Sequence, residues 1–558
     1  MRRSSIFLAF LAACSSNNPS TSPTPVSGGY DVVIENGRVV DGTGSAWFYG
    51  DIGIRGGKIA TIVPRGLLAK ATATERVNAA GLVVAPGFID IQSHSRDAFL
   101  DGDGRVVGKI TQGITTEIMG EAGTNAPQNQ GTGIDPKHDF TGPRGFDHWL
   151  TAMKTHGVTP NIGSFVGAST IRMYAKGMAQ GAATPAELDT MRAVVRNAME
   201  DGAFGIGSAL IYPPGNYAST EELIEINKAS APYGGVYITH MRSEADAWLQ
   251  AIDEALRIGR EAGVPVEIYH LKAGGQRNWH KTSSAIAKID SARAAGQDIQ
   301  ADMYSYVAGG TGLSACLPPW ASADGKLFSN LKDPATWAKI RAEMDRVQDE
   351  WEALCQLGTP NGVLVLGLNK PENQKYVGKR LDEIAQMMGK DWEETVRDLL
   401  ISEEQRIGTV YFMMSEENVK TKLKQPWMKF GTDAGGSDPD SAKGLTHPRS
   451  YGNYPRILGK YVRDEKVMPL EEAIRKMSSA VATRLSIGDR GVLKNGMRAD
   501  IVVFDPNTIA DKATFEKPHQ LSVGMKYVLV NGVTVVRDGK HTGAKPGMIV
   551  RGPGYRAH

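Results

Sequence analysis

The chain has 558 residues, of which 41% are hydrophobic and 22% are charged. A chain of this length and composition can bury a large core, which excludes a wholly disordered protein. The formal net charge is +2, and Arg2 and Arg3 at the N-terminus account for this excess. The near-neutral remainder excludes recognition of nucleic acid through a strongly basic surface.

The first 14 residues resemble a bacterial lipoprotein signal peptide. A basic start is followed by the apolar residues 6–10, a run too short to span a bilayer as a helix. Leu11-Ala12-Ala13-Cys14 resembles a lipobox with Cys14 as the lipidated residue; ordinary signal cleavage beside an incidental cysteine is the alternative. Residues 15–28 are predicted to form a flexible tether. We therefore expect an exported, membrane-anchored lipoprotein that faces the periplasm of a Gram-negative bacterium.

Short β-branched runs alternate with glycine turns near both ends of the chain. In residues 29–84 they include Tyr30-Asp31-Val32-Val33-Ile34, and residues 490–552 repeat the style in runs such as 499–504 and 527–536. Such alternation is typical of strands joined by tight turns. Because the two segments share one pattern, we expect a small β-sandwich domain built from both chain ends.

Residues 85–489 are predicted to form a TIM-type (β/α)8 barrel. Charged helical stretches separate several of the apolar runs, and Thr184 and Pro185 are suited to begin a helix over residues 185–201. A second clear helix is predicted over residues 247–262. Eight such β/α units imply a closed barrel of parallel strands. The predicted strands are residues 84–92, 114–121, 161–167, 203–210, 236–240, 266–271, 298–304 and 428–433.

The regular spacing breaks after the seventh predicted strand, over residues 307–427. Residues 332–354 and 381–400 within this segment are predicted to be helical. An insertion at this place lies over the carboxyl edge of the barrel and is a candidate lid. The insertion also carries Cys316 and Cys355, which form either two free thiols or one bridge.

Several of the predicted strands end in residues that bind metals. His240 and His270 each end a short apolar run, and His94, Glu121 and Asp433 follow the first, second and eighth strands. The carboxyl ends of barrel strands meet at one edge, where catalysis takes place. Zinc binds a few nitrogen or oxygen donors with one position left open, and hydrolysis needs a carboxylate beside the metal. Each residue alone could be a rim, turn or cap residue, but their coincidence predicts a metal-dependent hydrolase.

Five stretches of the chain resemble the amidohydrolase superfamily and, within it, the N-acyl-D-amino-acid deacylase (D-aminoacylase) family. The resemblance extends over nearly all of the mature sequence, and it implies hydrolysis of N-acyl-D-amino acids to a carboxylate and a free D-amino acid. The stretches are Ala85-Pro86-Gly87-Phe88-Ile89-Asp90, Gln112-Gly113-Ile114-Thr115-Thr116-Glu117, Thr239-His240-Met241-Arg242-Ser243-Glu244, His270-Leu271-Lys272 and His447-Pro448-Arg449-Ser450-Tyr451-Gly452.

The resemblance also implies a role for each site residue. Zinc would polarise the acyl carbonyl and activate water, while Asp433 would act as the acid/base. A cation would meet the substrate carboxylate, although Lys272 and Arg449 could instead form ion pairs at the barrel rim. The implied residues are Asp433 and His94 for catalysis, Glu121, His240 and His270 for zinc, and Tyr212, Lys272 and Arg449 for substrate.

Two positions depart from the family pattern. The first strand ends in Gln92-Ser93-His94, where the family has His-x-His, and an amide is a poorer zinc donor than imidazole. Ala122 stands where better-known members have a metal-binding cysteine, with Glu121 one residue earlier, although side chains alternate along a strand. We therefore expect one zinc ion per chain and leave a second, weaker metal open.

Other activities remain as alternatives. Residues 205–210, at the end of the fourth strand, contain no lysine for the carboxylated bridge of hydantoinases and dihydroorotases. Gly309-Gly310 stands where the family has polar substrate-loop residues, so dipeptides or other N-acyl amines are alternative substrates. A non-catalytic, ligand-binding surface lipoprotein is the third possibility, which zinc content would distinguish. The acyl chain, the accepted side chain and the oligomeric state stay open.

Overall fold

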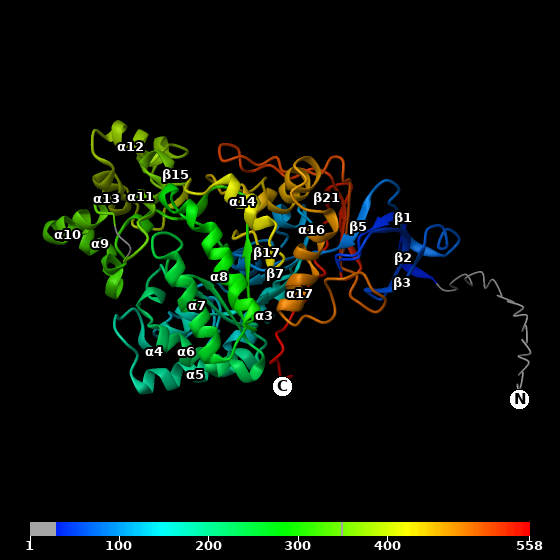
Figure 1. The fold of residues 1–558 in the computed structure, drawn as a ribbon, viewed down its shortest axis with the longest axis horizontal. Helices are drawn as coiled ribbons and strands as arrows, with labels where there is room; N and C mark the ends of the chain where they lie inside the picture. The colour runs from blue at the N-terminus through cyan, green and yellow to red at the C-terminus, as the bar shows by residue number, and fades with distance from the viewer. Residues whose placement is uncertain (1–28, 348–349, 558) are drawn as a thin grey trace, which may run out of the picture.

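The computed structural model describes residues 29–347 and 350–557 (Figure 1). The predicted signal peptide, Cys14 and the tether therefore lie outside the described residues. Among the helices that are described, none is both long and apolar enough to cross a membrane. The strands of the two chain ends lie at one end of the molecule, and the helices of the insertion lie at the other.

Strands from both chain ends form one nine-stranded sheet, as the shared pattern predicts. β5 (Val83–Pro86) joins the two halves, because it pairs in parallel with β1 (Tyr30–Val39) and antiparallel with β18 (Ile501–Phe504). The hydrogen-bonded order is β21-β20-β19-β18-β5-β1-β2-β3, and β4 pairs with β1. The boundaries at residues 84 and 490 stay predictions. The remaining strands are β2 (Phe48–Arg55), β3 (Lys58–Pro64), β4 (Ala73–Asn78), β19 (Met525–Val530), β20 (Val533–Arg537) and β21 (Lys540–His541).

The single strand predicted over residues 84–92 is wrong, because the chain changes sheets at Gly87. β5 belongs to the terminal sheet, whereas β6 (Phe88–Asp90) is the first barrel strand. A Cβ atom on Gly87 would lie 2.1 Å from the Thr115 hydroxyl oxygen. Glycine is therefore required where the backbone passes between the two sheets.

The barrel strands are parallel and follow chain order. They form the runs β6-β7-β8 and β9-β10-β11-β12-β13-β17, and the amide of Phe204 donates to Ser164 O at 3.1 Å across the gap. Between the first and eighth strands, the amide of Asp433 donates to Gln92 O at 2.9 Å. These contacts form the predicted TIM-type barrel. Its further strands are β7 (Ile114–Met119), β8 (Asn161–Ser164), β9 (Val166–Gly167), β10 (Gly205–Ala209), β11 (Val236–His240), β12 (Val266–Ile268), β13 (Ile299–Met303) and β17 (Met428–Phe430).

Helices cover the barrel where the sequence predicts them. α5 (Pro185–Glu200) begins with a capping box between Thr184 and Glu187 and has proline in its first turn. α7 (Trp248–Ala262) buries one face, which includes Trp248 and Ile252. Other helices of the barrel region are α3 (Gly145–His156), α4 (Ala168–Lys176), α6 (Thr220–Ser230), α8 (Thr282–Ala294), α14 (Glu416–Leu423), α15 (Arg449–Arg456), α16 (Leu470–Met477) and α17 (Ser479–Arg484).

The insertion has its own small sheet, in the order β14-β16-β15, and its own hydrophobic cluster. The helix predicted over residues 332–354 is too long, because α10 (Pro334–Met344) ends ten residues earlier and residues 345–347 and 350–353 are not helical. The helix predicted over residues 381–400 is divided at Gly389, which has a φ of +65°. The other elements are α9 (Leu327–Lys332), α11 (Leu354–Gly358), α12 (Leu381–Met388), α13 (Trp392–Glu403), β14 (Gly309–Gly312), β15 (Val363–Val365) and β16 (Gly408–Tyr411).

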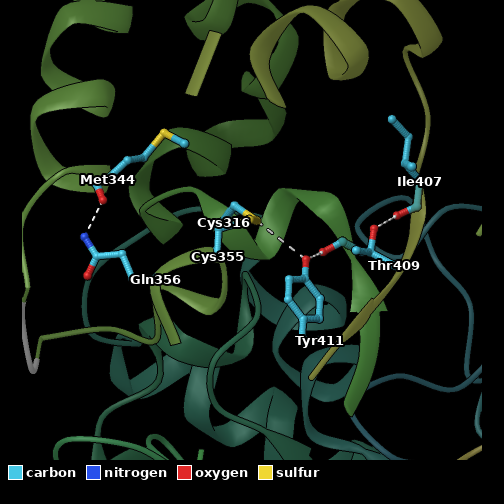
Figure 2. Close-up of a disulfide and its surroundings, with 8 residues drawn as sticks. Cys316, Met344, Cys355, Gln356, Ile407, Thr409 and Tyr411 are labelled. Atoms are coloured by element: carbon cyan, nitrogen blue, oxygen red, sulfur yellow. Dashed lines mark hydrogen bonds between the residues drawn. A yellow bond between two sulfur atoms is a disulfide. The ribbon is translucent and has the colours of Figure 1, made fainter. Parts of the chain in front are cut away.

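Cys316 and Cys355 form a disulfide, which settles the choice that the sequence left open (Figure 2). The bridge closes a loop between residues 39 apart and lies beside Tyr411 of β16, whose hydroxyl is 3.7 Å from Cys316 Sγ. Both cysteines are buried in the hydrophobic cluster of the insertion. The disulfide therefore fastens α11 to the segment that follows β14.

Candidate active site

The carboxyl ends of the barrel strands open into a cavity of about 620 Å³, which the insertion covers in part. Its lining comes from strand ends and from β14 and β16 of the insertion. The structure brings all eight sequence-predicted site residues into this one cavity. They are His94, Glu121, Tyr212, His240, His270, Lys272, Asp433 and Arg449.

Two buried histidines and one glutamate form the centre of the site. Glu121 Oε1 lies 3.4 Å from His240 Nδ1 and 3.4 Å from His270 Nε2. The two imidazole rings meet edge to face with their centroids 4.5 Å apart. Because the donor atoms of these three residues all lie within 4.8 Å of one another, a single ion would reach all three.

This donor set fits zinc. Two imidazole nitrogens and one carboxylate oxygen are ligands that catalytic zinc sites use, and a fourth position is left for water or substrate. The buried Nε2 of His240 has no hydrogen-bond partner and faces Glu244 at 3.4 Å, so Nδ1 is the nitrogen directed to the centre. The residues present therefore fit zinc in type and in spacing, and His94, Glu121 and Asp433 form a second group of possible donors beside them.

The backbone after two strands turns so that these side chains converge. His270 follows β12 with a φ of +33°, and its amide donates to the buried carboxylate of Asp302 at 2.9 Å. After β7 the chain passes through positive φ at Gly120 and Ala122. Because of these turns, the side chain of Glu121 does not follow the alternating directions of side chains along a strand. It can therefore point toward the two histidines.

Glu121 is held as a carboxylate. Burial raises its pKa, but the hydrogen bonds of His240, His270 and His94 outweigh burial and hold the pKa well below its usual range. Gln92 also donates from Nε2 to Glu121 Oε2 at 2.6 Å. Gln92, which stands where the family has histidine, therefore contacts the predicted metal ligand Glu121 directly.

His94, Asp433 and Arg449 form a second group at the edge of the centre. His94 Nε2 lies 3.0 Å from Asp433 Oδ1 and 3.2 Å from Glu121 Oε2. Partial loss of hydration inside the cavity disfavours the imidazolium, but the hydrogen bonds to Asp433 and Glu121 raise the pKa of His94 to about 9. Arg449 Nη1 lies 2.8 Å from Asp433 Oδ2, and its charge helps to lower the pKa of Asp433 although burial opposes it.

Glu244 is a site residue that sequence reasoning missed. Its carboxylate lies 2.9 Å from His270 Nδ1 and forms an ion pair with Lys272. An outer carboxylate of this kind orients a metal-binding histidine through its second nitrogen. The signal was its position four residues after His240 in one of the matching stretches.

Glu352 of the insertion also reaches this group. It accepts a hydrogen bond from the backbone amide of Glu244, and it lines the cavity. Burial and the nearby charge of Glu244 raise the pKa of Glu352 to about 8. Since 108 residues separate Glu244 from Glu352, no local spacing indicates this contact.

The three predicted substrate residues lie around the centre. Tyr212 packs its ring edge against His240 and donates from its hydroxyl to Thr311 Oγ1 at 2.9 Å. Arg449 stacks over the ring of Tyr304, with the guanidinium 4.4 Å from the ring centroid. Lys272 and Arg449 both form ion pairs, which was the alternative to substrate binding. These pairs line the cavity, so they lie inside the site.

Comparison with known proteins agrees with the geometry. A family model described as the amidohydrolase family matches residues 379–536. The chain is 35% identical to the D-aminoacylase of Alcaligenes xylosoxydans xylosoxydans, over 93% of this chain and 97% of that protein. It is 33% identical to the N-acyl-D-glutamate deacylase of the same organism, over 93% of this chain and 96% of that protein.

Solved structures give the same relationship. A D-aminoacylase described with a binuclear metal centre, one-metal activation and second-metal attenuation is 33% identical and superposes with a TM-score of 0.77, covering 94% of this chain and 100% of that chain. The N-acyl-D-glutamate deacylase of Bordetella bronchiseptica, complexed with zinc and a phosphonate mimic of the tetrahedral intermediate, is 31% identical with a TM-score of 0.77 and the same coverage. A D-hydantoinase at 13% identity shares the fold alone. The chain belongs to the D-aminoacylase family of metal-dependent amidohydrolases.

Proposed function

We propose that this protein hydrolyses the amide bond of N-acyl-D-amino acids, with zinc held by Glu121, His240 and His270. The observation that carries the proposal is the convergence of these three residues beside the His94 and Asp433 pair, in one cavity of a D-aminoacylase-family barrel. Zinc bound there would polarise the acyl carbonyl and favour deprotonation of water.

Asp433 is placed to move the proton. Arg449 favours its ionised form, so the carboxylate can accept a proton from the attacking water and return it to the leaving nitrogen. His94, at 3.0 Å from Asp433, is placed to orient that carboxylate and would donate to an oxyanion formed beside it.

Arg449 is placed to bind the α-carboxylate of the substrate. Its Nε and Nη1 atoms are buried in the cavity wall and have no hydrogen-bond partner, although Nη1 lies near Asp433. Nη1 already has the charge of Asp433 beside it, but a buried donor such as Nε is costly unless a ligand satisfies it. A substrate carboxylate would accept from Nε, and its position would place the neighbouring amide next to the metal ligands.

One zinc ion per chain is the count that Gln92 favours. The Gln92 amide is buried and donates at 2.6 Å to the Glu121 oxygen that also faces His94. A second metal between His94, Glu121 and Asp433 would break this hydrogen bond. The neutral Gln92 amide would then be a poor ligand for that metal, in comparison with an imidazole. Gln92→His should therefore bind close to two zinc ions, while the unaltered protein binds one, as measured by elemental analysis after dialysis.

An exported, lipid-anchored form is the localisation that we propose. It is supported by the lipobox-like Leu11-Ala12-Ala13-Cys14 and by the Cys316–Cys355 disulfide, which suits an oxidising compartment. Cys14→Ser should move the protein from the detergent-extracted membrane fraction to the soluble fraction. Equal partitioning of both proteins would contradict the anchor.

Metal removal tests the proposed activity. Amine release from N-acetyl-D-methionine should fall to background after chelation and return on addition of one equivalent of zinc. Hydrolysis that persists in metal-free protein, verified by elemental analysis, would contradict the role of the three ligands. A protein that neither copurifies with zinc nor takes it up would favour the non-catalytic alternative.

A further inference from the structure

One cation of the cavity has no partner among the described residues. Arg406 lines the cavity and is exposed, and neither a hydrogen bond nor an ion pair involves its guanidinium. The other cations of the lining are engaged: Lys272 with Glu244, Arg449 with Asp433, and Arg96 with the carbonyl of Gly123. Arg406 therefore offers the cavity a positive charge that no group of residues 29–347 or 350–557 pairs with.

The backbone of the insertion holds Arg406 against the cavity wall. Arg406 precedes β16, and Gly312 of β14 pairs with Gly408 of β16. A Cβ atom on Gly312 would lie 3.3 Å from Arg406 Cγ and 3.4 Å from Arg406 Nε. Because Gly312 has no side chain, the aliphatic part of Arg406 can pack against β14 at this point. The preceding residues of β14, Gly309-Gly310-Thr311, line the cavity.

The wall near Arg406 is suited to a polar group. Thr311 and Thr409 lie on the two paired strands, and the tyrosines Tyr212 and Tyr411 also line the cavity. A carboxylate beside an unpaired guanidinium gains charge-assisted hydrogen bonds. The Thr311 hydroxyl accepts a hydrogen bond from Tyr212 and keeps its own proton to donate to such a group. The α-carboxylate already has a place at Arg449, so Arg406 remains for another anionic group.

We propose that Arg406 is a specificity-determining residue that binds a second carboxylate, so the preferred substrates are N-acyl-D-amino acids with an acidic side chain. This inference rests on the proposed function and names its substrate class. The side-chain carboxylate of such a substrate would meet Arg406, while Arg449 holds the α-carboxylate and the amide lies at the metal ligands.

N-acetyl-D-glutamate and N-acetyl-D-glutamine test the inference, because they have the same shape and differ in side-chain charge. The kcat/KM of the wild type should favour the glutamate, and Arg406→Gln should lower this ratio about tenfold, which is about 1.4 kcal/mol. Arg406→Lys should restore part of the preference, and Arg406→Glu should favour N-acetyl-D-lysine. Lys339→Gln removes a positive charge from the exposed face of α10 outside the cavity, and it should leave the ratio at the wild-type value.

A wild type that prefers the glutamine, or a ratio that Arg406→Gln leaves unchanged, would overturn the inference. Equal losses for both substrates would also overturn it, because they would assign Arg406 to the α-carboxylate or to folding. Calorimetric binding of the same two compounds to zinc-loaded Asp433→Asn separates this inference from the proposed function. Tighter binding of the glutamate that depends on Arg406, without turnover by the wild type, would support the anion site while contradicting the amidohydrolase proposal.

Discussion

Asp433 is the residue on which the proposed proton transfer depends. It lies 3.0 Å from His94 and 2.8 Å from Arg449, and it is not among the three groups that hold zinc in the proposal. An asparagine keeps the shape of the side chain but cannot accept a proton from water. The residue therefore separates catalysis from metal binding.

We predict that Asp433→Asn keeps its zinc and loses about a thousandfold in kcat, in line with the loss of a general acid/base. Zinc content and steady-state amine release measure the two effects on one sample. The matched control is Asp440→Asn, an exposed aspartate in the same loop. Turnover within tenfold of the wild type would remove Asp433 from the mechanism.

Lys422 of α14 is a buried cation whose titration affects stability. Burial and the nearby Lys272 lower its pKa to about 7, and its amine donates to Leu271 O at 2.5 Å. In the unfolded chain the pKa returns to 10.5, so between pH 7 and 10.5 the unfolded chain binds more protons. The contribution of this group therefore destabilises the fold fully below pH 7 and becomes less unfavourable as the pH rises through this window.

We predict that Lys422→Met removes this penalty. The free energy of unfolding of the variant, relative to the wild type, should be higher by about 3 kcal/mol at pH 6 than at pH 9.5. Urea unfolding at the two pH values measures the difference. The exposed Lys424 provides the control variant Lys424→Met, which should show no such pH dependence. A relative stability that does not change with pH would show that the fold does not lower the pKa of Lys422.

At the level of single residues, the sequence predicts where the strand-end ligands meet but not what surrounds them. His240 and His270 could be predicted because each ends an apolar run, and the barrel then brings strand ends together. Glu352 and Arg406 could not, because they come from the insertion, whose path depends on long-range packing. The Gln92 contact with Glu121 also depends on the register between the first two strands.

Among the elements, those with strong local signals were predictable. α5 has a capping box and an early proline, and its predicted bounds agree with the structure within one residue. The helix predicted over residues 332–354 ends at Met344. Further along the chain, Glu352 lines the cavity and Cys355 forms the disulfide with Cys316. Tertiary contacts therefore overrode the local helical pattern there.

The disulfide is the element that we expect to order the insertion. It closes a 39-residue separation that includes Glu352 and Leu354 of the cavity lining. We predict that a Cys316→Ser, Cys355→Ser double variant loses up to about 4 kcal/mol of unfolding free energy, because the unfolded chain gains entropy. Limited proteolysis should cut the variant first between residues 316 and 355. Unchanged cleavage and stability would show that packing alone orders this loop.

Over the whole molecule, Asp500 connects the terminal sheet to the barrel. Its buried carboxylate accepts hydrogen bonds from Arg490 at 2.6 Å, from Asn161 of β8 at 3.1 Å and from the amide of Asn531 at 2.7 Å. The shared strand pattern predicts that the chain ends pair, but it does not reveal this contact with the barrel. Polar groups far apart in the sequence meet here only after both parts have folded.

We predict that Asp500→Ala lowers the free energy of unfolding by about 3 kcal/mol, because it leaves buried donors unsatisfied. Thermal and urea unfolding of the purified protein measure the loss. Glu516→Ala, at an exposed position of the same C-terminal region, is the control. A stability equal to that of the wild type would mean that the sheet is fixed to the barrel by apolar packing alone.

The most direct test of the whole account compares N-acetyl-D- and N-acetyl-L-amino acids in matched pairs. The zinc-loaded protein without its lipid anchor should release amine from the D-series only, with Asp433→Asn as the blank. The pairs should include both methionine and glutamate, so that a narrow side-chain preference is not mistaken for inactivity. Release from the L-series alone, or from neither series with zinc bound, would contradict the proposal that this amidohydrolase acts on N-acyl-D-amino acids.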